Sequence, residues 1–169
     1  MFQTVRINYV DKQAFYAELE AEIRGLLETT WFTNLSNVSA ALMQHLPDLN
    51  WAGFYLHAKS EVLQLGPFQG LPACLSMPFT KGVCGKAARE RVSVLVDDVH
   101  EFPGHIACDA RSRSELVIPL VIKTEIGERV LGVLDLDSPL PARFTEEDRK
   151  GLERIAAILV GSTHWPTEF

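Results

Sequence analysis

The chain has 169 residues, of which 47% are hydrophobic and 22% are charged, and its formal net charge is −6. This length and composition fit one folded domain and exclude a largely disordered chain. The acidic balance argues against a nucleic-acid partner, because a phosphate backbone is held by a basic surface. No apolar stretch approaches the roughly 20 residues of a membrane-spanning helix, so we expect no membrane partner either.

The N-terminal segment and the number of cysteines bear on the cellular compartment. Residues 1–16 interleave charged residues with single apolar ones and lack the apolar core and cleavage site of a signal peptide. Three cysteines, an odd number, do not suit a secreted disulfide scaffold. We therefore expect a cytoplasmic protein.

Two amphipathic helices are predicted over residues 11–46. Apolar residues recur at spacings of three and four over residues 11–27, with charged residues between them. The second helix is predicted to start near Asn34, where an asparagine or a serine can cap it, and to stop at Pro47.

A third helix is predicted over residues 145–161. Thr145 and Asp148 have the spacing of a capping box, and Phe144 can act as its hydrophobic staple. This helix is expected to close the domain.

The segment between these helices, residues 50–139, has the patterns of a sheet with inserted loops. Residues 51–57 alternate between two faces, both of them apolar enough to be covered. Segments 115–122 and 129–137 are strongly apolar strands, joined as a hairpin and expected at the sheet centre. Shorter strands are predicted at 62–65 and 92–96, a helix at 82–91, and irregular loops at 66–74 and 100–114.

The three cysteines, Cys74, Cys84 and Cys108, lie far apart along the chain. None belongs to a CxxC pair, so a zinc site is weakly indicated. Burial as a small hydrophobic residue is the more frequent role of a free cysteine. Cys74 and Cys108 nevertheless fall in irregular, polar segments, which favours thiol chemistry.

Cys108 is the stronger candidate for a nucleophile. His105, Arg111 and Arg113 lie close to it in the sequence, and nearby cations lower the pKa of a thiol. Cys84 stands at the start of a predicted helix, where the helix dipole can activate a thiol. Packing of Cys84 in the core is about equally well indicated.

Acidic residues interrupt two of the predicted strands. Asp135 and Asp137 alternate along one strand and therefore share a face, and Glu115 begins the neighbouring strand. A solvated sheet edge would show the same pattern. If the three carboxyl groups converge, their like charges raise at least one pKa and retain a proton that can serve as a general acid.

Trp51 and Tyr55 share one face of the predicted strand 51–57. They can line an apolar slot for a ligand. Aromatic pairs on a strand are more often part of a core, so this pair alone identifies no site.

Five segments of the chain together resemble the free methionine-(R)-sulfoxide reductases, a family of stand-alone GAF-domain enzymes. These segments are NWAGFYL, LGPFQGLPAC, KGVCG, GHIACDARSRSELVIPL and GVLDLDSP, and they span about residues 50–139. Three cysteines at this spacing distinguish these enzymes from GAF sensor domains. The connection IKTEIGERVLG is a few residues longer than usual in the family and is expected at a hairpin tip.

The resemblance implies an α+β fold in which one GAF domain occupies residues 1–169. A central antiparallel sheet of about six strands would be flanked by helices. The N-terminal helices would occupy 11–46, the sheet and active-site loops 50–139, and the C-terminal helix 145–161.

The resemblance also implies roles for particular residues. Cys108 would be the catalytic cysteine, Cys74 the principal resolving cysteine, and Cys84 an auxiliary thiol. The acidic residues Glu115, Asp135 and Asp137 would hold the ammonium group and the sulfoxide oxygen of the substrate, and the aromatic residues Trp51 and Tyr55 would lie near its methyl-sulfur end.

The expected reaction is reduction of free L-methionine-(R)-sulfoxide to L-methionine. Cys108 would attack the sulfur while Glu115 and Asp137 supply the proton, leaving Cys108 as a sulfenic acid. Condensation with Cys74 would give a disulfide that thioredoxin reduces. No metal or organic cofactor is expected, and base rates favour a homodimer.

Two other functions fit parts of the sequence. A GAF sensor module would bind a small molecule on the same face without turnover. A zinc site or thiol redox switch would use the three cysteines together with His105. A sensor normally comes attached to an output domain, for which this sequence shows no candidate segment, and a zinc site would be detected by elemental analysis of the purified protein.

Overall fold

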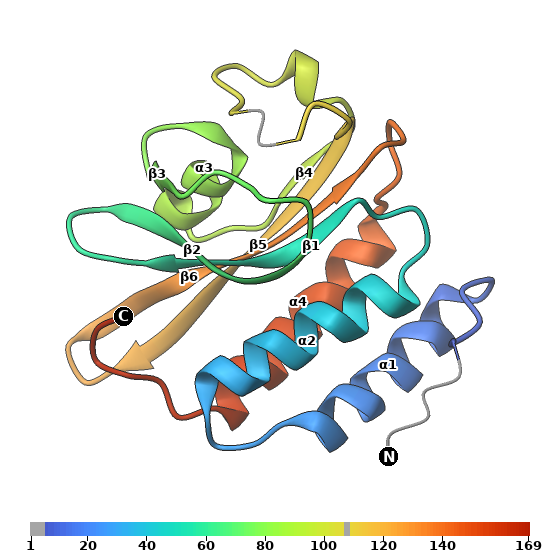
Figure 1. Ribbon diagram of the computed structural model, residues 1–169. Helices are drawn as coiled ribbons and strands as arrows, with labels where there is room; N and C mark the ends of the chain where they lie inside the picture. Colours follow the sequence, from blue (N-terminus) through green and yellow to red (C-terminus); the bar gives the residue numbers. More distant parts are fainter. Residues whose placement is uncertain (1–5, 107–108) are drawn as a thin grey trace.

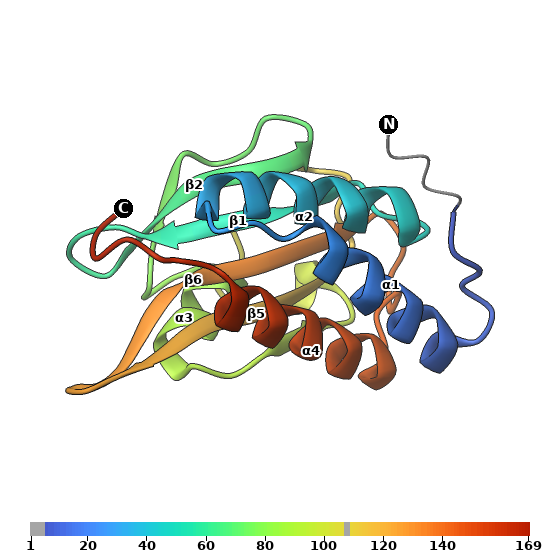
Figure 2. The same ribbon diagram turned by 90° about the horizontal axis from the view of Figure 1, so that it is seen from below.

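The computed structural model describes residues 6–106 and 109–169. Three helices lie on one face of an antiparallel sheet (Figure 1). They are α1 (Lys12–Leu26), α2 (Trp31–His45) and α4 (Glu146–Ser162). Seen from the helical side, α2 and α4 run along the sheet while α1 packs against both (Figure 2).

The sheet has six strands in the order β3-β2-β1-β6-β5-β4, and every neighbouring pair is antiparallel. The chain belongs to the α+β class, and the expected sheet of about six strands is confirmed. The strands are β1 (Trp51–His57), β2 (Val62–Gly70), β3 (Ser76–Pro78), β4 (Val94–Val96), β5 (Ser114–Thr124) and β6 (Gly127–Ser138).

The opposite face of the sheet carries α3 (Gly82–Glu90), the short 3-10 helix at Val99–Glu101 and the loops between them. Two apolar clusters result, one on each face. The alternation of β1 divides its residues between them: Phe54 packs towards the three long helices, and Trp51 and Tyr55 pack towards α3. Both faces of β1 are buried, as its sequence predicts.

The start of α2 differs from the sequence-based prediction. The helix begins three residues earlier, after Thr30, and Asn34 lies inside it. The Asn34 side chain is fully buried, donates to the Glu28 carbonyl at 2.7 Å and to Thr163 Oγ1 at 2.8 Å, and accepts from the Glu28 amide. Asn34 thus ties the α1–α2 loop to the C-terminal segment instead of capping the helix.

Strand β2 is longer than predicted, because Gly66 and Pro67 continue it instead of ending it. Strand β3 pairs only with the first residues of β2, so the second half of β2 is a sheet edge where proline loses no ladder hydrogen bond. A register shift opposite this segment, between Gly53 and Tyr55, accommodates it. The three-residue strand β3 was not predicted.

The capping box at the start of α4 is present as predicted. Asp148 accepts from the Thr145 amide at 2.8 Å, and Phe144 is buried in the core. Asp148 is itself fully buried, and it also accepts a hydrogen bond from Tyr16 at 2.8 Å and contacts Lys12 Nζ at 2.6 Å. The cap therefore links α4 to α1 as well as starting the helix.

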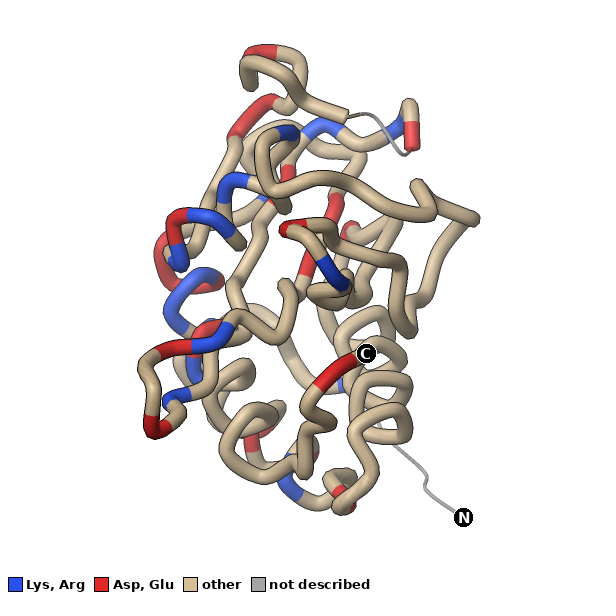
Figure 3. Tube along the Cα trace, turned by 90° about the vertical axis from the view of Figure 1, so that its left-hand side faces the viewer, with Lys and Arg blue, Asp and Glu red and all other residues tan. Residues whose placement is uncertain are grey.

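Basic and acidic residues are interspersed along the Cα trace drawn in Figure 3, and the basic residues are not gathered in one continuous stripe. In the part of the chain that the structure describes, we find no helix with both the length and the apolar character to cross a bilayer.

Candidate active site

The predicted acidic residues meet on the α3 side of the sheet. Strand pairing places Glu115 of β5 opposite Asp137 of β6, and Asp137 opposite Trp51 of β1. One step further along β6, Asp135 faces Val117. Glu115 and Asp135 are 5% and 6% exposed, so the convergence expected from the sequence is present and the solvated-edge alternative is wrong for these two residues.

The three carboxyl groups hold protons more tightly than ordinary carboxyl groups. Burial raises the pKa of Glu115, and the Asp137 charge raises it further. Burial also raises the pKa of Asp135 and of Asp137, with further contributions from Glu115 and Asp135, respectively. Because like charges in so small a space oppose ionisation of all three groups, the site favours retention of a proton, as a general acid requires.

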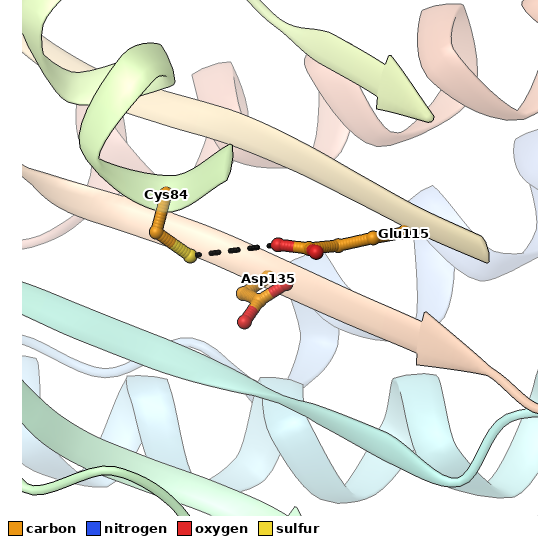
Figure 4. A group of neighbouring side chains, drawn as sticks. All are labelled: Cys84, Glu115 and Asp135. Atoms are coloured by element: carbon orange, nitrogen blue, oxygen red, sulfur yellow. Dashed lines mark hydrogen bonds between the residues drawn. The ribbon is translucent and has the colours of Figure 1, made fainter. Parts of the chain in front are cut away.

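Cys84 reaches the same place from the first turn of α3. Its Sγ–H donates to Glu115 Oε1 at 3.9 Å, and Figure 4 shows Cys84, Glu115 and Asp135 pointing towards one another. Burial raises the pKa of the thiol well above its ordinary value, and the neighbouring carboxylates raise it further. Packing of Cys84 in the core is therefore favoured over activation of its thiol by the helix dipole.

His105 covers Glu115 from the loop before β5. Its Nε2 lies 3.4 Å from Glu115 Oε2, and burial lowers the pKa of the imidazole. A neutral imidazole is therefore favoured at this position. The sequence suggested His105 as a neighbour of Cys108 and as a partner of the three cysteines in a zinc site or redox switch, not as a contact of Glu115.

The loop that leads into β5, from residue 109 onwards, is fixed to the same strands through Asn50. Asn50 Nδ2 donates to Asp109 Oδ2 at 3.0 Å and to Ser112 Oγ at 2.9 Å. Ser112 in turn hydrogen-bonds the Asp137 carboxyl and moderates the rise in its pKa. Asn50 and Ser112 were missed by the sequence reasoning. A polar residue directly before a buried strand was the available signal for Asn50.

An aromatic stack forms the other wall of the site. The Trp51 ring stacks on Tyr55 with centroids 5.8 Å apart and on Phe68 with centroids 5.3 Å apart. Gly53 lies under this stack, where a Cβ atom would come within 2.3 Å of Phe68 Cβ. Both roles considered for Trp51 and Tyr55 remain compatible with this position, because the rings are buried and Trp51 is the register partner of Asp137.

Cys74 approaches the aromatic wall from the loop after β2. The Tyr55 hydroxyl donates to the Cys74 carbonyl at 3.2 Å, and Cys74 is disulfide-bonded, whereas Cys84 is a free thiol. Cys108, the predicted nucleophile, lies outside the described residues.

The two arginines near Cys108 in the sequence are already paired with carboxylates. Arg111 contacts Asp109 at 2.7 Å, and Arg113 contacts Asp98 at 2.7 Å. These pairs neutralise much of the positive charge that was expected to lower the pKa of a thiol in this loop.

The enclosed space between these groups is small. It measures about 20 Å³ and is bordered by Cys84, His105, Glu115, Asp135 and Asp137. A larger hollow of about 680 Å³ lies at the other end of the sheet, between α3 and the β5–β6 hairpin, and none of the predicted site residues borders it. We place the candidate site at the smaller space, because the convergent polar groups are there.

The fold and these residues match known proteins. A family model described as "GAF domain" matches residues 33–160. The free methionine-R-sulfoxide reductase of Escherichia coli is 47% identical over 152 residues, which cover 89% of each chain. The chain belongs to the free methionine-(R)-sulfoxide reductase family of GAF domains.

Other members of the family agree with this assignment. The free methionine-R-sulfoxide reductase of Saccharomyces cerevisiae is 38% identical over 164 residues, covering 90% of this chain and 89% of its own. The free methionine-R-sulfoxide reductase of Neisseria meningitidis, whose structure was solved with its substrate, superposes with a TM-score of 0.86 at 40% identity over 95% of each chain.

Proposed function

We propose that this chain reduces free L-methionine-(R)-sulfoxide to L-methionine by thiol chemistry. The observation that carries the proposal is the acidic group of Glu115, Asp135 and Asp137 beside an aromatic wall, in a chain that is 47% identical over 152 residues to a reductase of this name. The acidic group suits the polar end of the substrate, and the aromatic wall suits its methyl-sulfur end.

The acidic group can perform two tasks at once. An ionised carboxylate can hold the substrate ammonium group, while a protonated carboxyl donates a proton to the sulfoxide oxygen as the S–O bond breaks. The raised pKa values of Glu115 and Asp137 keep one proton available for this step. We assign Glu115 and Asp137 to proton donation and Asp135 to ammonium binding.

The redox step needs a nucleophilic thiol and a resolving thiol. The Cys108 thiolate attacks the sulfoxide sulfur, the oxygen is transferred to the cysteine sulfur, and methionine leaves. The resulting sulfenic acid condenses with the Cys74 thiol, forming a disulfide and releasing water. The Cys74 loop lies against Tyr55 at the site, which supports its role as the resolving thiol.

Recycling requires a two-electron donor. We propose thioredoxin, whose dithiol has a reduction potential near about −270 mV and can reduce such a disulfide. Cys84 is buried beside Glu115, so we place it in the wall of the site, with a disulfide-exchange role only after the site opens.

Substrate entry requires side chains over the acidic group to move. A space of about 20 Å³ holds about one water molecule, whereas methionine sulfoxide has several times that volume. His105 and Ile106 border this space on the loop side, so they are the groups that must yield. Enclosure of the ammonium group by carboxylates would then exclude an amide nitrogen, and with it a methionine sulfoxide inside a polypeptide.

A dithiothreitol-driven assay with product quantification tests this function. Free methionine-(R)-sulfoxide, its S epimer and a peptide-bound sulfoxide are compared at equal concentration. We expect methionine from the free R epimer alone. A reduced, folded protein that binds the free sulfoxide without forming methionine would instead support the sensor alternative.

A further inference from the structure

Three side chains of the types that ligate metals converge beneath α3. One ligand atom each of Cys84, Glu115 and Asp135 lies within 4.8 Å of the other two, and all three residues are buried. They come from α3, β5 and β6, three elements that the core holds in place (Figure 4). The grouping is therefore fixed by the fold and does not depend on flexible surface side chains.

One carboxyl oxygen in this group is unmatched. Asp135 Oδ1 is buried and accepts no hydrogen bond from any residue that the structure describes. A buried carboxyl oxygen without a donor or a cation costs free energy, and native structures hold few of them. Asp135 is 6% exposed and points towards Cys84 and Glu115, so the missing partner belongs in the space between them.

The size of this space limits what can fill it. A volume of about 20 Å³, bordered by all three residues, accommodates one water molecule or one ion. Water is a modest partner for two carboxyl groups and a thiol, whereas a divalent cation neutralises their charge directly.

We propose that Cys84, Glu115 and Asp135 bind a single divalent transition-metal ion of the zinc type. A thiolate with two carboxylate oxygens suits zinc, whereas Mg²⁺ and Ca²⁺ need more oxygen ligands and reject sulfur. Zinc binds sulfur at about 2.3 Å and carboxylate oxygen at about 2.0–2.2 Å. Tetrahedral ligands are then about 3.3–3.6 Å apart, close to the 3.9 Å between Cys84 Sγ and Glu115 Oε1.

A fourth ligand and a residue that orients one of the three ligands can also be named. A water molecule takes the fourth position in zinc sites with three protein ligands. His105 Nε2 lies 3.4 Å from the second oxygen of Glu115 and can orient that ligand. This set differs from the zinc alternative considered from the sequence, because it includes two carboxyl groups and only one cysteine.

Binding of the ion must release protons. The thiol loses its proton to become a thiolate ligand, and any proton shared by the two carboxyl groups is also displaced. Protons on the thiol and on the carboxyl groups therefore compete with the ion for the same atoms. Affinity therefore increases as the pH rises.

An ion at this position would exclude the substrate. It occupies the place proposed for the substrate ammonium group and removes the proton from Glu115, so zinc acts as a reversible competitive inhibitor. This consequence rests on the proposed function, whereas binding of the ion does not.

Titration of the fully reduced chain with Co²⁺ and then Zn²⁺ tests the site. We expect one Co²⁺ per chain, a thiolate-to-cobalt charge-transfer absorption, and displacement by Zn²⁺. Cys84→Ser should abolish the absorption, Asp135→Asn should weaken binding by about tenfold or more, and Cys74→Ser, the matched control, should leave both unchanged. No binding to the wild-type chain, or loss of the absorption in Cys74→Ser but not in Cys84→Ser, would overturn the proposal.

X-ray absorption spectroscopy of the zinc-loaded wild-type chain gives a readout that needs no variant. We expect one sulfur neighbour and oxygen or nitrogen neighbours in the remaining positions. Two or more sulfur neighbours would assign the ion to the other cysteines and overturn the proposal.

Methionine formation, measured on the metal-free chain, separates the two ideas. Formation of methionine without metal binding would support the proposed function and contradict the metal site. Metal binding without formation of methionine would support the metal site and contradict the proposed function. If both occur, increasing free methionine-(R)-sulfoxide should displace Co²⁺, and an inhibition by Zn²⁺ that excess substrate does not relieve would contradict the competitive mode.

Discussion

Glu115 and Asp137 are register partners on neighbouring strands, and the Asp137 charge raises the pKa of Glu115. Both pKa values are raised by burial as well as by neighbouring charge. The pair therefore titrates as a unit, and this unit supplies the proposed general acid.

The pH dependence of turnover follows from this pair. A general acid must carry its proton, so kcat should fall as the pH rises through the raised pKa. Glu115→Gln should lower kcat by about 10²–10⁴-fold and flatten the alkaline limb of the profile. Glu101→Gln, an exposed control on the 3-10 helix, should leave both unchanged. An alkaline limb that persists unaltered in Glu115→Gln would assign the proton to another group.

The burial of Asp135 should make the free energy of unfolding depend on pH. Its pKa in the folded chain is raised above the ordinary value of 3.8, so the folded chain binds more protons than the unfolded chain at pH values between the unfolded and folded pKa. The free energy of unfolding therefore decreases as the pH rises through that interval, by about 1.4 kcal/mol for each pH unit.

Urea unfolding of the wild type and Asp135→Asn at several pH values checks this expectation. Asp135→Asn should gain stability relative to the wild type as the pH rises from about 5 to about 8. His105 acts in the opposite sense, because its pKa is lowered, but it is present in both chains and cancels in the difference. Parallel curves for the two chains would show that Asp135 is ionised freely in the folded state.

The absence of a side chain at Gly53 allows the aromatic rings of the wall to stack, so a substitution there should disturb them. An alanine Cβ at this position would meet Phe68 Cβ at 2.3 Å and the Trp51 ring at 2.8 Å. Gly53→Ala should reduce the free energy of unfolding by about 1–3 kcal/mol and raise KM, because the stack must shift. Gly161→Ala in α4 is the matched control, since nothing lies within 4 Å of its Cβ position, and it should be neutral or stabilising by about 0.5–1 kcal/mol.

Loss of the resolving thiol should leave the first turnover intact and reduce the steady-state rate. Cys74→Ser should release about one methionine per chain and then stop, leaving steady-state turnover with thioredoxin reduced by about tenfold or more. Rapid-quench measurement of the first turnover, followed by the coupled assay, distinguishes these phases. Undiminished steady-state turnover would transfer the resolving role to Cys84.

The alternation of Asp135 and Asp137 was sufficient to predict that their side chains share a face, because period-two geometry is local, but it did not distinguish a buried group from a solvated edge. The capping box of Thr145 and Asp148 was readable for a similar reason, since its geometry is local. These features depend on a few residues that are close in sequence.

The errors involve residues whose role is set by distant partners. Asn34 has a good capping side chain, yet its partners Glu28 and Thr163 draw it into the interior. Pro67 reads as a strand breaker, but it lies where β2 is a sheet edge. For Cys84 the sequence left activation by the helix dipole and packing in the core open, and burial against Glu115 and Asp135, which no local pattern reveals, favours the core.

The most direct test of the reductase is a single turnover of the fully reduced chain, without any external reductant. Free methionine-(R)-sulfoxide, its S epimer and the Cys108→Ser variant are compared, and both released methionine and remaining thiols are counted. We predict about one methionine per chain with the loss of two thiols, for the R epimer and the wild-type chain only. No methionine from folded, reduced protein, or equal release by Cys108→Ser, would contradict the proposed activity and its nucleophile.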